Sequence, residues 1–497
     1  MRTGEVTAEL ETAAPASLDA RSSRVIWLLL GATFVVILNE TIMGVAIPRL
    51  VVDLKVSVEL AQWLTTVFML TMAVVIPVTG WLLQRLETRP AFILAMSFFS
   101  AGTLLAAIAP GFTVLLIARV TQACGTAIMM PLLMTTIMEL VPPHERGRLM
   151  GRVSTVISVA PAIGPTISGL VLNSLSWRWM FLIVLPIAVA MLVIGVLSVE
   201  NVSPPERAPL DGWSIPLAAL GFGGVVFGLA QIGGATDASS GGSSAVWVMT
   251  TALGVGAIAL ALFVLRQRRL ARRDRALLDL RPFLVRNFTV SVVVMVIMMI
   301  ALFGTIIVLP IYMQTVLGIG SLLSGLLLLP GGLVMGLFAP AVGRVYDRRG
   351  PTVLLVPGAV IVSADLWFLA LFATDHAPIW LVLVAHIVLS FGLALMFTPL
   401  FTTALGSVTK HFYSHASAIV GTVQQVAGAA GTAVFVTVLA AVTLAATADG
   451  AEALPAQASG VRAAFLIGAI VSLAAIVGAF FVRRPLEEVA EETGEVV

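Results

Sequence analysis

Four ionisable side chains stand inside long apolar runs of this sequence: Glu40, Arg119, Asp365 and His386. Burying a charge in hydrocarbon costs at least about 2.5–3.5 kcal/mol, so residues of this kind are by default functional or paired. In a low-dielectric cavity, desolvation favours the neutral form of a carboxyl group, and a nearby guanidinium favours the ionised form. A carboxyl group under these opposing influences can bind and release a proton. These residues therefore indicate proton chemistry within a membrane.

Two of the four, Glu40 and Arg119, are expected at comparable depth. At 1.5 Å of rise per residue, Glu40 lies about 20 Å from the inner boundary and Arg119 about 12–14 Å from the outer boundary. The hydrocarbon core is about 30 Å thick, so the two side chains can pair if their helices are neighbours. Such a pair couples protons or acts as a static ion pair, with Arg119 as a structural counter-ion. Asp365 and His386 reach a similar depth in the other half of the chain.

Uncharged polar and thioether side chains in the same apolar runs are candidates for binding a substrate. Amides can hydrogen-bond a ligand without charge selectivity, but they can equally join helices. Flexible thioethers suit a promiscuous apolar pocket, although a methionine-rich helix also suits plain packing. His386 is either part of such a site or a packing residue. The predicted substrate-binding residues are Asn39, Gln122, Met129, Gln314, His386, Gln424 and Gln425.

The composition places these residues in a membrane protein. The chain is 59% hydrophobic and 11% charged, with a mean hydropathy of +1.06, whereas soluble proteins are about 25% charged. Fourteen segments have the apolar length needed to cross a bilayer, about 20 residues, and the seventh is expected at 213–232. Lys and Arg concentrate in alternate loops, which predicts that both termini are cytoplasmic. We expect a multi-pass protein of the plasma membrane.

A motif that occurs twice divides the chain into related halves. Pro77 to Arg85 returns as Pro340 to Arg348, and both copies have the pattern P-x-x-G-x-x-x-[Q/D]-R. Membrane proteins with two related halves are typically transporters that bind cargo between the repeats. The predicted organisation is a disordered cytoplasmic tail (1–24), a six-helix bundle (25–198), two extra helices with a basic loop (199–287), a second six-helix bundle (288–482) and an acidic cytoplasmic tail (483–497).

Other features narrow the class of protein. The single cysteine, Cys124, excludes an internal disulfide. No nucleophile–base set or metal-spaced cluster is present, so we expect neither an enzyme nor a metal site. The arginine-rich run from Arg266 to Arg275 is interpreted as a cytoplasmic loop that sets topology, with binding of acidic lipid headgroups as the alternative. Nucleic-acid binding is not expected, because this loop has no recognition scaffold.

Several motifs in this sequence resemble those of the major facilitator superfamily. Gly80 to Arg89 resembles the loop motif G-x-x-x-D-R-x-G-R-R with Gln84 at the Asp position, whereas the second copy, Gly343 to Gly350, keeps the Asp. Arg119-x-x-Gln122 looks like the motif associated with proton coupling. Gly164-Pro165-x-x-x-Gly169 looks like the antiporter motif, in a glycine- and proline-rich segment that suits a hinge or a kinked packing helix.

Within the superfamily, the chain looks most similar to the fourteen-span drug:proton antiporters. The stretch beginning Leu38-Asn39-Glu40-Thr41 is similar to L-D-x-T-I-x-x-V-A-x-P, with Asn39 at the Asp position. The variant L-N-E-T looks closest to the lincomycin-resistance branch. Trp177 to Phe181 resembles the W-R-W-x-F signature that precedes the sixth span.

The resemblance implies an all-α fold of two six-helix bundles with two extra central helices, fourteen transmembrane helices in all. It implies a proton-coupled exporter of amphipathic drugs or antibiotics. The residues that we expect in proton coupling are Glu40, Arg119 and Asp365. We expect no cofactor besides the coupling protons, a small amphipathic substrate, contact with membrane lipids, and a functional monomer. The alternatives are export of a lipid, glycolipid or endogenous metabolite, and a channel or non-transporting sensor. The motif residues expected to control conformation are Gly80, Gln84, Arg85, Arg89, Gly164, Pro165, Gly169, Gly343, Asp347 and Arg348.

Overall fold

The structure, a computed structural model, describes residues 19–201, 209–232 and 242–485. Within these ranges the chain is helical and contains no strand. The long helices are α1 (Ala20–Leu54), α2 (Val58–Arg85), α3 (Thr88–Ala107), α4 (Phe112–Leu140), α5 (Arg146–Ser174), α6 (Arg178–Ser198), α7 (Ser214–Ala230), α9 (Gly242–Ala271), α10 (Arg286–Ile311), α11 (Ser321–Arg349), α12 (Thr352–Phe372), α13 (Ile379–Gly406), α14 (Tyr413–Ala448) and α15 (Ala453–Ala479). Short turns are η1 (Pro143–Glu145), η2 (Arg281–Leu284), η3 (Tyr312–Val316) and η4 (Lys410–Phe412).

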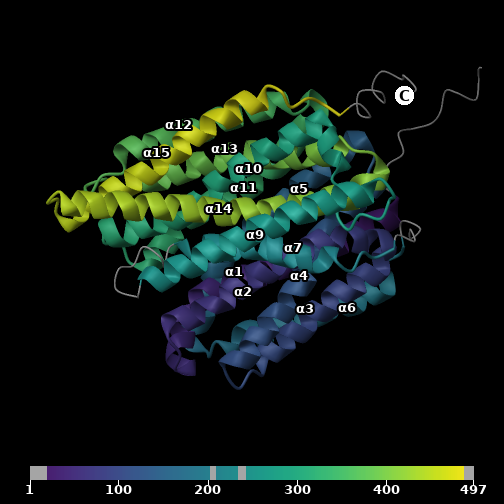
Figure 1. The fold of residues 1–497 in the computed structure, drawn as a ribbon, viewed down its shortest axis with the longest axis horizontal. Helices are drawn as coiled ribbons and strands as arrows, with labels where there is room; N and C mark the ends of the chain where they lie inside the picture. The colour runs from purple at the N-terminus through teal and green to yellow at the C-terminus, as the bar shows by residue number, and fades with distance from the viewer. Residues whose placement is uncertain (1–18, 202–208, 233–241, 486–497) are drawn as a thin grey trace, which may run out of the picture.

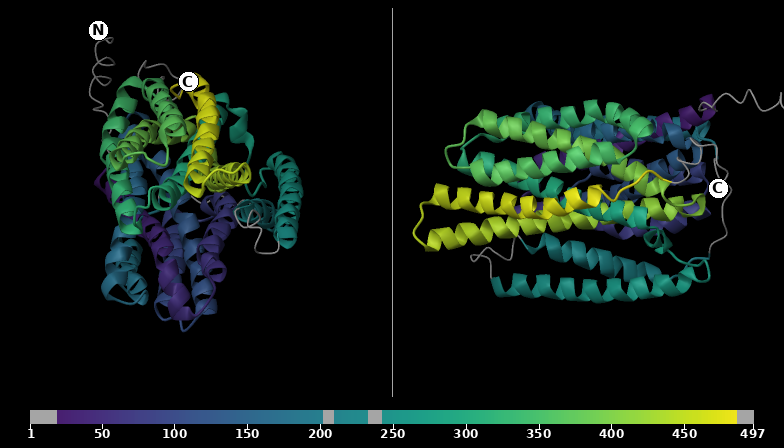
Figure 2. Two further views of the ribbon diagram at one scale, coloured as in Figure 1. Left: turned by 90° about the vertical axis from the view of Figure 1, so that its left-hand side faces the viewer. Right: turned by 90° about the horizontal axis from the view of Figure 1, so that it is seen from above.

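Helices α1–α6 pack together as one bundle, and α10–α15 as a second (Figure 1). The bundles meet along two seams, where α5 packs on α11 and α2 packs on α14. Residues near the start of α1 and the end of α15 lie at the same end of the molecule (Figure 2), which we call the terminal end. The bundles converge at the terminal end, and their helices spread apart at the opposite end (Figure 1).

Thirteen of the described helices are long and apolar enough to cross a membrane. The seventh predicted span, 213–232, is occupied by α7, which has only 17 residues. A helix of that length spans about 26 Å at 1.5 Å per residue, less than the bilayer core of about 30 Å. Thirteen of the fourteen predicted spans thus coincide with helices long and apolar enough to cross a membrane, and the remaining one is a short apolar helix.

Helix α7 lies over the seam between α2 and α14, and α9 lies along α7 (Figures 1 and 2). The contact with the seam is apolar: Ala73 of α2, Val226 of α7 and Ala429 of α14 form one buried cluster. Gly224 and Gly256 allow α7 and α9 to approach closely, because a Cβ on either would meet the backbone of the other helix at 2.9 Å or less.

A polar contact fixes this helix pair at the terminal end. Arg266 of α9 donates two hydrogen bonds of 2.7 Å to the carboxylate of Asp211. The same carboxylate accepts hydrogen bonds from the backbone N–H and the hydroxyl of Ser214, in the first turn of α7. These bonds, that from Arg266 above all, lower the pKa of Asp211 from 3.8 to about 2.

We predict that Asp211→Asn destabilises the protein in a pH-dependent way. Because folding lowers the pKa of this carboxyl group, its stabilising effect is complete above the unfolded value of 3.8 and is lost as pH falls toward about 2. The variant is expected to unfold at a lower temperature than the wild type at neutral pH, and the difference is expected to shrink below about pH 4. Thermal unfolding of the purified protein across a pH series measures this. Asp449→Asn, at an exposed position at the opposite end, is the control; an equal effect of both variants would contradict the prediction.

Candidate functional site

Arg119 of α4 lies in the interior of the first bundle with only 1% of its surface exposed. Its Nε donates to the carbonyl of Leu64 in α2 at 3.2 Å, and its Nη1 donates to Gln122 Oε1 at 3.0 Å. Gln122 in turn donates to the hydroxyl of Thr103 in α3 at 3.0 Å. The guanidinium also lies 4.1 Å from the ring centre of Phe68, a cation–π contact. Arg119 is therefore held by neutral partners on α2 and on its own helix, and Gln122 links it to α3.

Glu40 of α1 is half-buried. It lies near enough to Arg119 for a Coulombic interaction. Within the described part of the chain, however, no hydrogen bond or ion pair to Glu40 is found. The adjacent Asn39 is fully buried, and neither polar atom of its amide has a hydrogen-bond partner. The structure thus places Glu40 near Arg119 without a direct bond between the two side chains.

The corresponding residues of the second bundle are arranged differently. Asp365 of α12 is 4% exposed, and its Oδ2 has no hydrogen-bond partner. His386 of α13 is half-buried and contacts the carbonyl of Leu328 in α11 through Nε2 at 3.1 Å, while Nδ1 is buried without a partner. No ion pair joins these two side chains in the described structure. Asp365 is thus a buried carboxyl group that forms no ion pair with any residue the structure describes.

The predicted substrate-binding residues occupy several environments. Asn39, Gln122 and Met129 are fully buried in this conformation. Gln424 and Gln425 of α14 are half-buried, and their amides lie 3.9 Å from the sulfur atoms of Met299 in α10 and Met72 in α2, respectively. Gln425 thus bridges the seam between the bundles. Gln314 is exposed in η3. In the described structure, no hydrogen bond joins any of these residues to another.

Asp347, at the end of α11, binds the N-terminus of α5 across the other seam. Its Oδ1 accepts a hydrogen bond of 2.7 Å from the backbone N–H of Gly147. Its Oδ2 accepts one of 2.8 Å from the backbone N–H of Arg148. A helix N-terminus carries free N–H groups and partial positive charge, so a carboxylate is stabilised there. Gly147 faces Gly343, and a Cβ on either glycine would collide with the opposite helix. Arg348, by contrast, is exposed.

The first copy of the repeated motif makes weaker contacts. The amide of Gln84 donates to the carbonyl of His411 in η4 at 3.3 Å. Gly80 packs against the imidazole of His415 in α14, where a Cβ would collide with Nδ1. Arg89 remains within its own bundle and donates to the carbonyl of Val196 at the end of α6 at 2.7 Å. Arg85 also has polar or electrostatic partners.

Further hydrogen bonds between the bundles lie toward the terminal end. Thr135 of α4 donates to Ser417 of α14, and Thr398 of α13 donates to Ser154 of α5. Arg146, 2% exposed, donates to the hydroxyl of Tyr413 at 3.2 Å. Arg146 was not singled out in the sequence analysis. It is the first residue of α5, directly before Gly147, whose backbone N–H binds Asp347.

The glycine- and proline-rich part of α5 lies where the seam with α11 ends. Gly164 contacts α1, because a Cβ there would collide with Thr41. Pro165 is exposed, and a Cβ on Gly169 would meet nothing within 4 Å. The last close approach of a glycine of α11 to α5 is that of Gly332 to Ala162.

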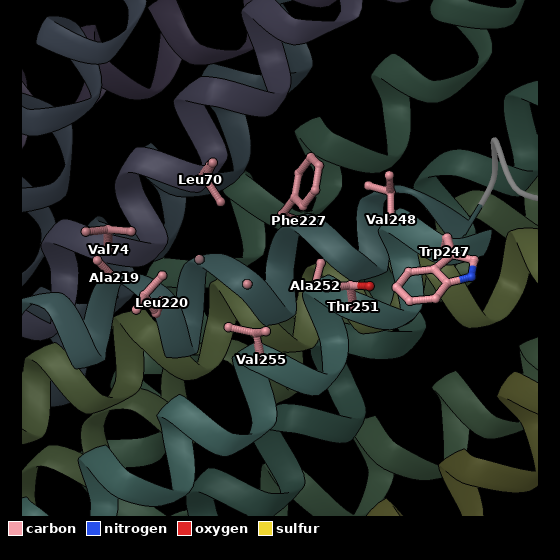
Figure 3. A pocket seen from close by; sticks show the side chains of 12 residues that line it. Leu70, Val74, Ala219, Leu220, Phe227, Trp247, Val248, Thr251, Ala252 and Val255 are labelled. Carbon is pink, nitrogen blue, oxygen red and sulfur yellow. The ribbon is translucent and has the colours of Figure 1, made fainter. Parts of the chain in front are cut away.

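A groove of about 650 Å³ lies outside this site, between α2, α7 and α9 (Figure 3). Its walls are apolar except for Thr251, and they include Leu70 of α2, Phe227 of α7 and Trp247 of α9. Trp247 is 73% exposed, as expected for a side chain that faces lipid in a membrane. None of the predicted site residues lines this groove. Among the described residues, no group of His, Cys, Asp and Glu is placed to hold a metal ion.

Sequence comparison identifies relatives over nearly the whole chain. Residues 29–220 and 212–432 match the profile of the Major Facilitator Superfamily. The lincomycin resistance protein LmrB of Bacillus subtilis is 39% identical over 96% of this chain and 98% of its own length. LmrB of Listeria monocytogenes is 37% identical over 91% and 95%, respectively. A multidrug resistance protein B homolog of Mycobacterium tuberculosis is 28% identical over 84% and 76%.

Solved structures share the fold. The human organic anion transporter MFSD10 superposes with a TM-score of 0.63 at 13% identity, covering 93% of this chain and all of its own. The proton:xylose symporter XylE superposes with a TM-score of 0.63 at 15% identity, covering 95% of this chain and 99% of its own. At these identities the likeness concerns the fold alone.

We predict that Asp347→Asn shifts the protein away from the arrangement closed at the terminal end. A hydrogen bond to a charged group contributes about 1.5–3 kcal/mol, and an amide can replace only one of the two that the carboxylate accepts. Since 1.4 kcal/mol corresponds to a factor of ten, we expect the open population to rise about tenfold. Distances between spin labels at the terminal ends of α5 and α11 measure it. Asp449→Asn is the control, and an unchanged distance distribution in Asp347→Asn would refute the role of this carboxylate.

Proposed function

Because the chain belongs to the major facilitator superfamily, and is therefore a multi-pass transporter of the cell membrane, we propose that it exports amphipathic drugs or antibiotics in exchange for protons. The names of its relatives support drug export: two are lincomycin resistance proteins and one is a multidrug resistance protein homolog. The amides of Gln424 and Gln425, beside methionine sulfur atoms, are suited to cargo that is partly polar and partly apolar.

The observation that carries the proton coupling is the unpaired carboxyl group of Glu40. It lies half-buried near Arg119, and the hydrogen bonds of that guanidinium go to a carbonyl and an amide. Protonation of Glu40 therefore breaks no ion pair, while it removes the Coulombic attraction between the two side chains. A proton can thus change the interaction between α1 and α4 without disturbing the partners of Arg119.

In the proposed cycle the chain has fourteen spans, with α7 as a short one, and the terminal end faces the cytoplasm, where the Lys- and Arg-rich loops belong. The conformation described above is then outward-facing, with its cytoplasmic end closed by Asp347 and the contacts around it. Glu40 takes up a proton from the outside, the cytoplasmic end opens, and drug enters as the proton leaves. Asp365 is a second carboxyl group that can bind a proton in the other bundle. The protein works as a monomer.

We predict that Glu40→Gln abolishes active transport but keeps drug exchange. The amide cannot carry a proton, so a pH gradient can no longer drive accumulation, whereas the side chain keeps its size and shape. Proteoliposomes loaded with lincomycin or another amphipathic antibiotic measure both: uptake driven by an imposed pH gradient, and exchange of labelled for unlabelled drug without a gradient.

Asp449→Asn, which removes a carboxyl group exposed at the opposite end, serves as the matched control and is expected to transport normally. If Glu40→Gln accumulates drug in response to the gradient as the wild type does, Glu40 is not the coupling group. If the wild type neither accumulates nor exchanges any compound of an antibiotic panel, drug export itself is wrong.

A further inference from the structure

The segment that joins α9 to α10, residues 272–285, is buried in part although most of it is not helical. The four residues from Arg272 to Arg275 are exposed, as expected for a polar connection. The next four, 276–279, are buried, with Leu277 0% and both Leu278 and Asp279 2% exposed. A loop that buries its backbone must find partners for its N–H groups within the protein.

One end of the buried stretch is held by Gln267 of α9, a fully buried residue. Its Oε1 accepts hydrogen bonds from the backbone N–H of Leu277 at 2.8 Å and of Leu278 at 3.3 Å. Its Nε2 donates to the hydroxyl of Ser214 in α7 at 2.7 Å. A single amide thus ties the loop to both helices of the α7–α9 pair.

The other end is held by α14 and η4. The backbone N–H of Asp279 donates to Nδ1 of His415 at 3.3 Å. Arg281 forms ion pairs with Asp279 and Asp274, and its guanidinium lies 5.0 Å from the ring centre of Phe412. The loop therefore reaches the first turn of α14, at the terminal end of the molecule.

This attachment lies at the seam between the bundles. His415 is the residue against which Gly80 of α2 packs, and the Gln84 contact to His411 lies one turn away. Helix α7 in turn packs on both α2 and α14. The loop is attached to α9 through Gln267 and to α14 through His415. If α2 and α14 separate at this end while the α7–α9 pair stays on α2, the loop must give up one of these two attachments.

We propose that residues 276–281, the closing segment, hold the terminal end shut by joining the α7–α9 pair to the seam between α2 and α14, and are released when that end opens. Gln267 is the positioning residue for this segment. The proposal gives the two extra helices a role in gating. It rests on the alternating access of the proposed function.

Cysteine accessibility tests the proposal in the purified protein, with Cys124→Ser as background. Leu278→Cys reports on the closing segment, Thr135→Cys on the contact between α4 and α14 beside the seam, and Arg273→Cys on the exposed part of the same loop. Without an opening substitution, maleimide is expected to label Arg273→Cys quickly and the other two cysteines slowly. The terminal end is opened by Asp347→Asn or by Gly343→Trp, whose indole does not fit against the Gly147 carbonyl.

We expect both opening variants to raise labelling of Thr135→Cys and Leu278→Cys together, with no change at Arg273→Cys. We also expect Gln267→Met, which removes the acceptor but keeps the length of the side chain, to raise labelling of Thr135→Cys several-fold. If Leu278→Cys stays protected from maleimide while Thr135→Cys becomes accessible, the closing segment does not move when the terminal end opens, and the proposal fails. It also fails if Gln267→Met leaves the seam unchanged, or if neither probe responds to either opening variant. Labelling needs neither drug nor a pH gradient, so a failure of the proposed transport would not alter this result.

Discussion

A carboxylate bound at a helix N-terminus is the interaction on which the closed end of this transporter depends. The first turn of α5 presents backbone N–H groups that have no partner within the helix, and Asp347 takes two of them from the opposite bundle. The contact is possible only because Gly147 faces Gly343, where any side chain would hold the helices apart. Electrostatic attraction and close packing therefore depend on each other at this seam.

The second seam lacks a carboxylate at the equivalent position of the repeat. Gln84 there makes one neutral hydrogen bond to a carbonyl, and neutral bonds are roughly half as strong as charge-assisted ones. The α7–α9 pair and the loop that follows it lie against this second seam, between α2 and α14. The two seams are thus stabilised by different means. A charged side chain, Asp347, joins α5 and α11, whereas the α7–α9 pair and the loop after it pack against α2 and α14.

The sequence was most informative where a physical constraint is local. Apolar length identified thirteen spans, and only α7, shortened to 17 residues, fell below the expected length. Counting residues brought Glu40 and Arg119 to the same depth, but it could not show that the guanidinium bonds to the Leu64 carbonyl, because every residue offers a carbonyl. The buried Leu277 and Leu278 follow an arginine-rich run, and nothing in their local pattern separates a buried loop from an exposed one.

The way in which Arg119 is held has an electrical consequence. Its hydrogen-bond partners, the carbonyl of Leu64 and the amide of Gln122, do not titrate, so its positive charge persists whether or not Glu40 carries a proton. In the proposed cycle, this pair has a net charge of one when protonated and none when deprotonated. Moving one elementary charge through the membrane potential is worth about 2.3 kcal/mol per 100 mV. A voltage that is negative inside therefore favours inward passage of the protonated form, and export of an uncharged drug draws energy from the voltage as well as from the proton concentration difference.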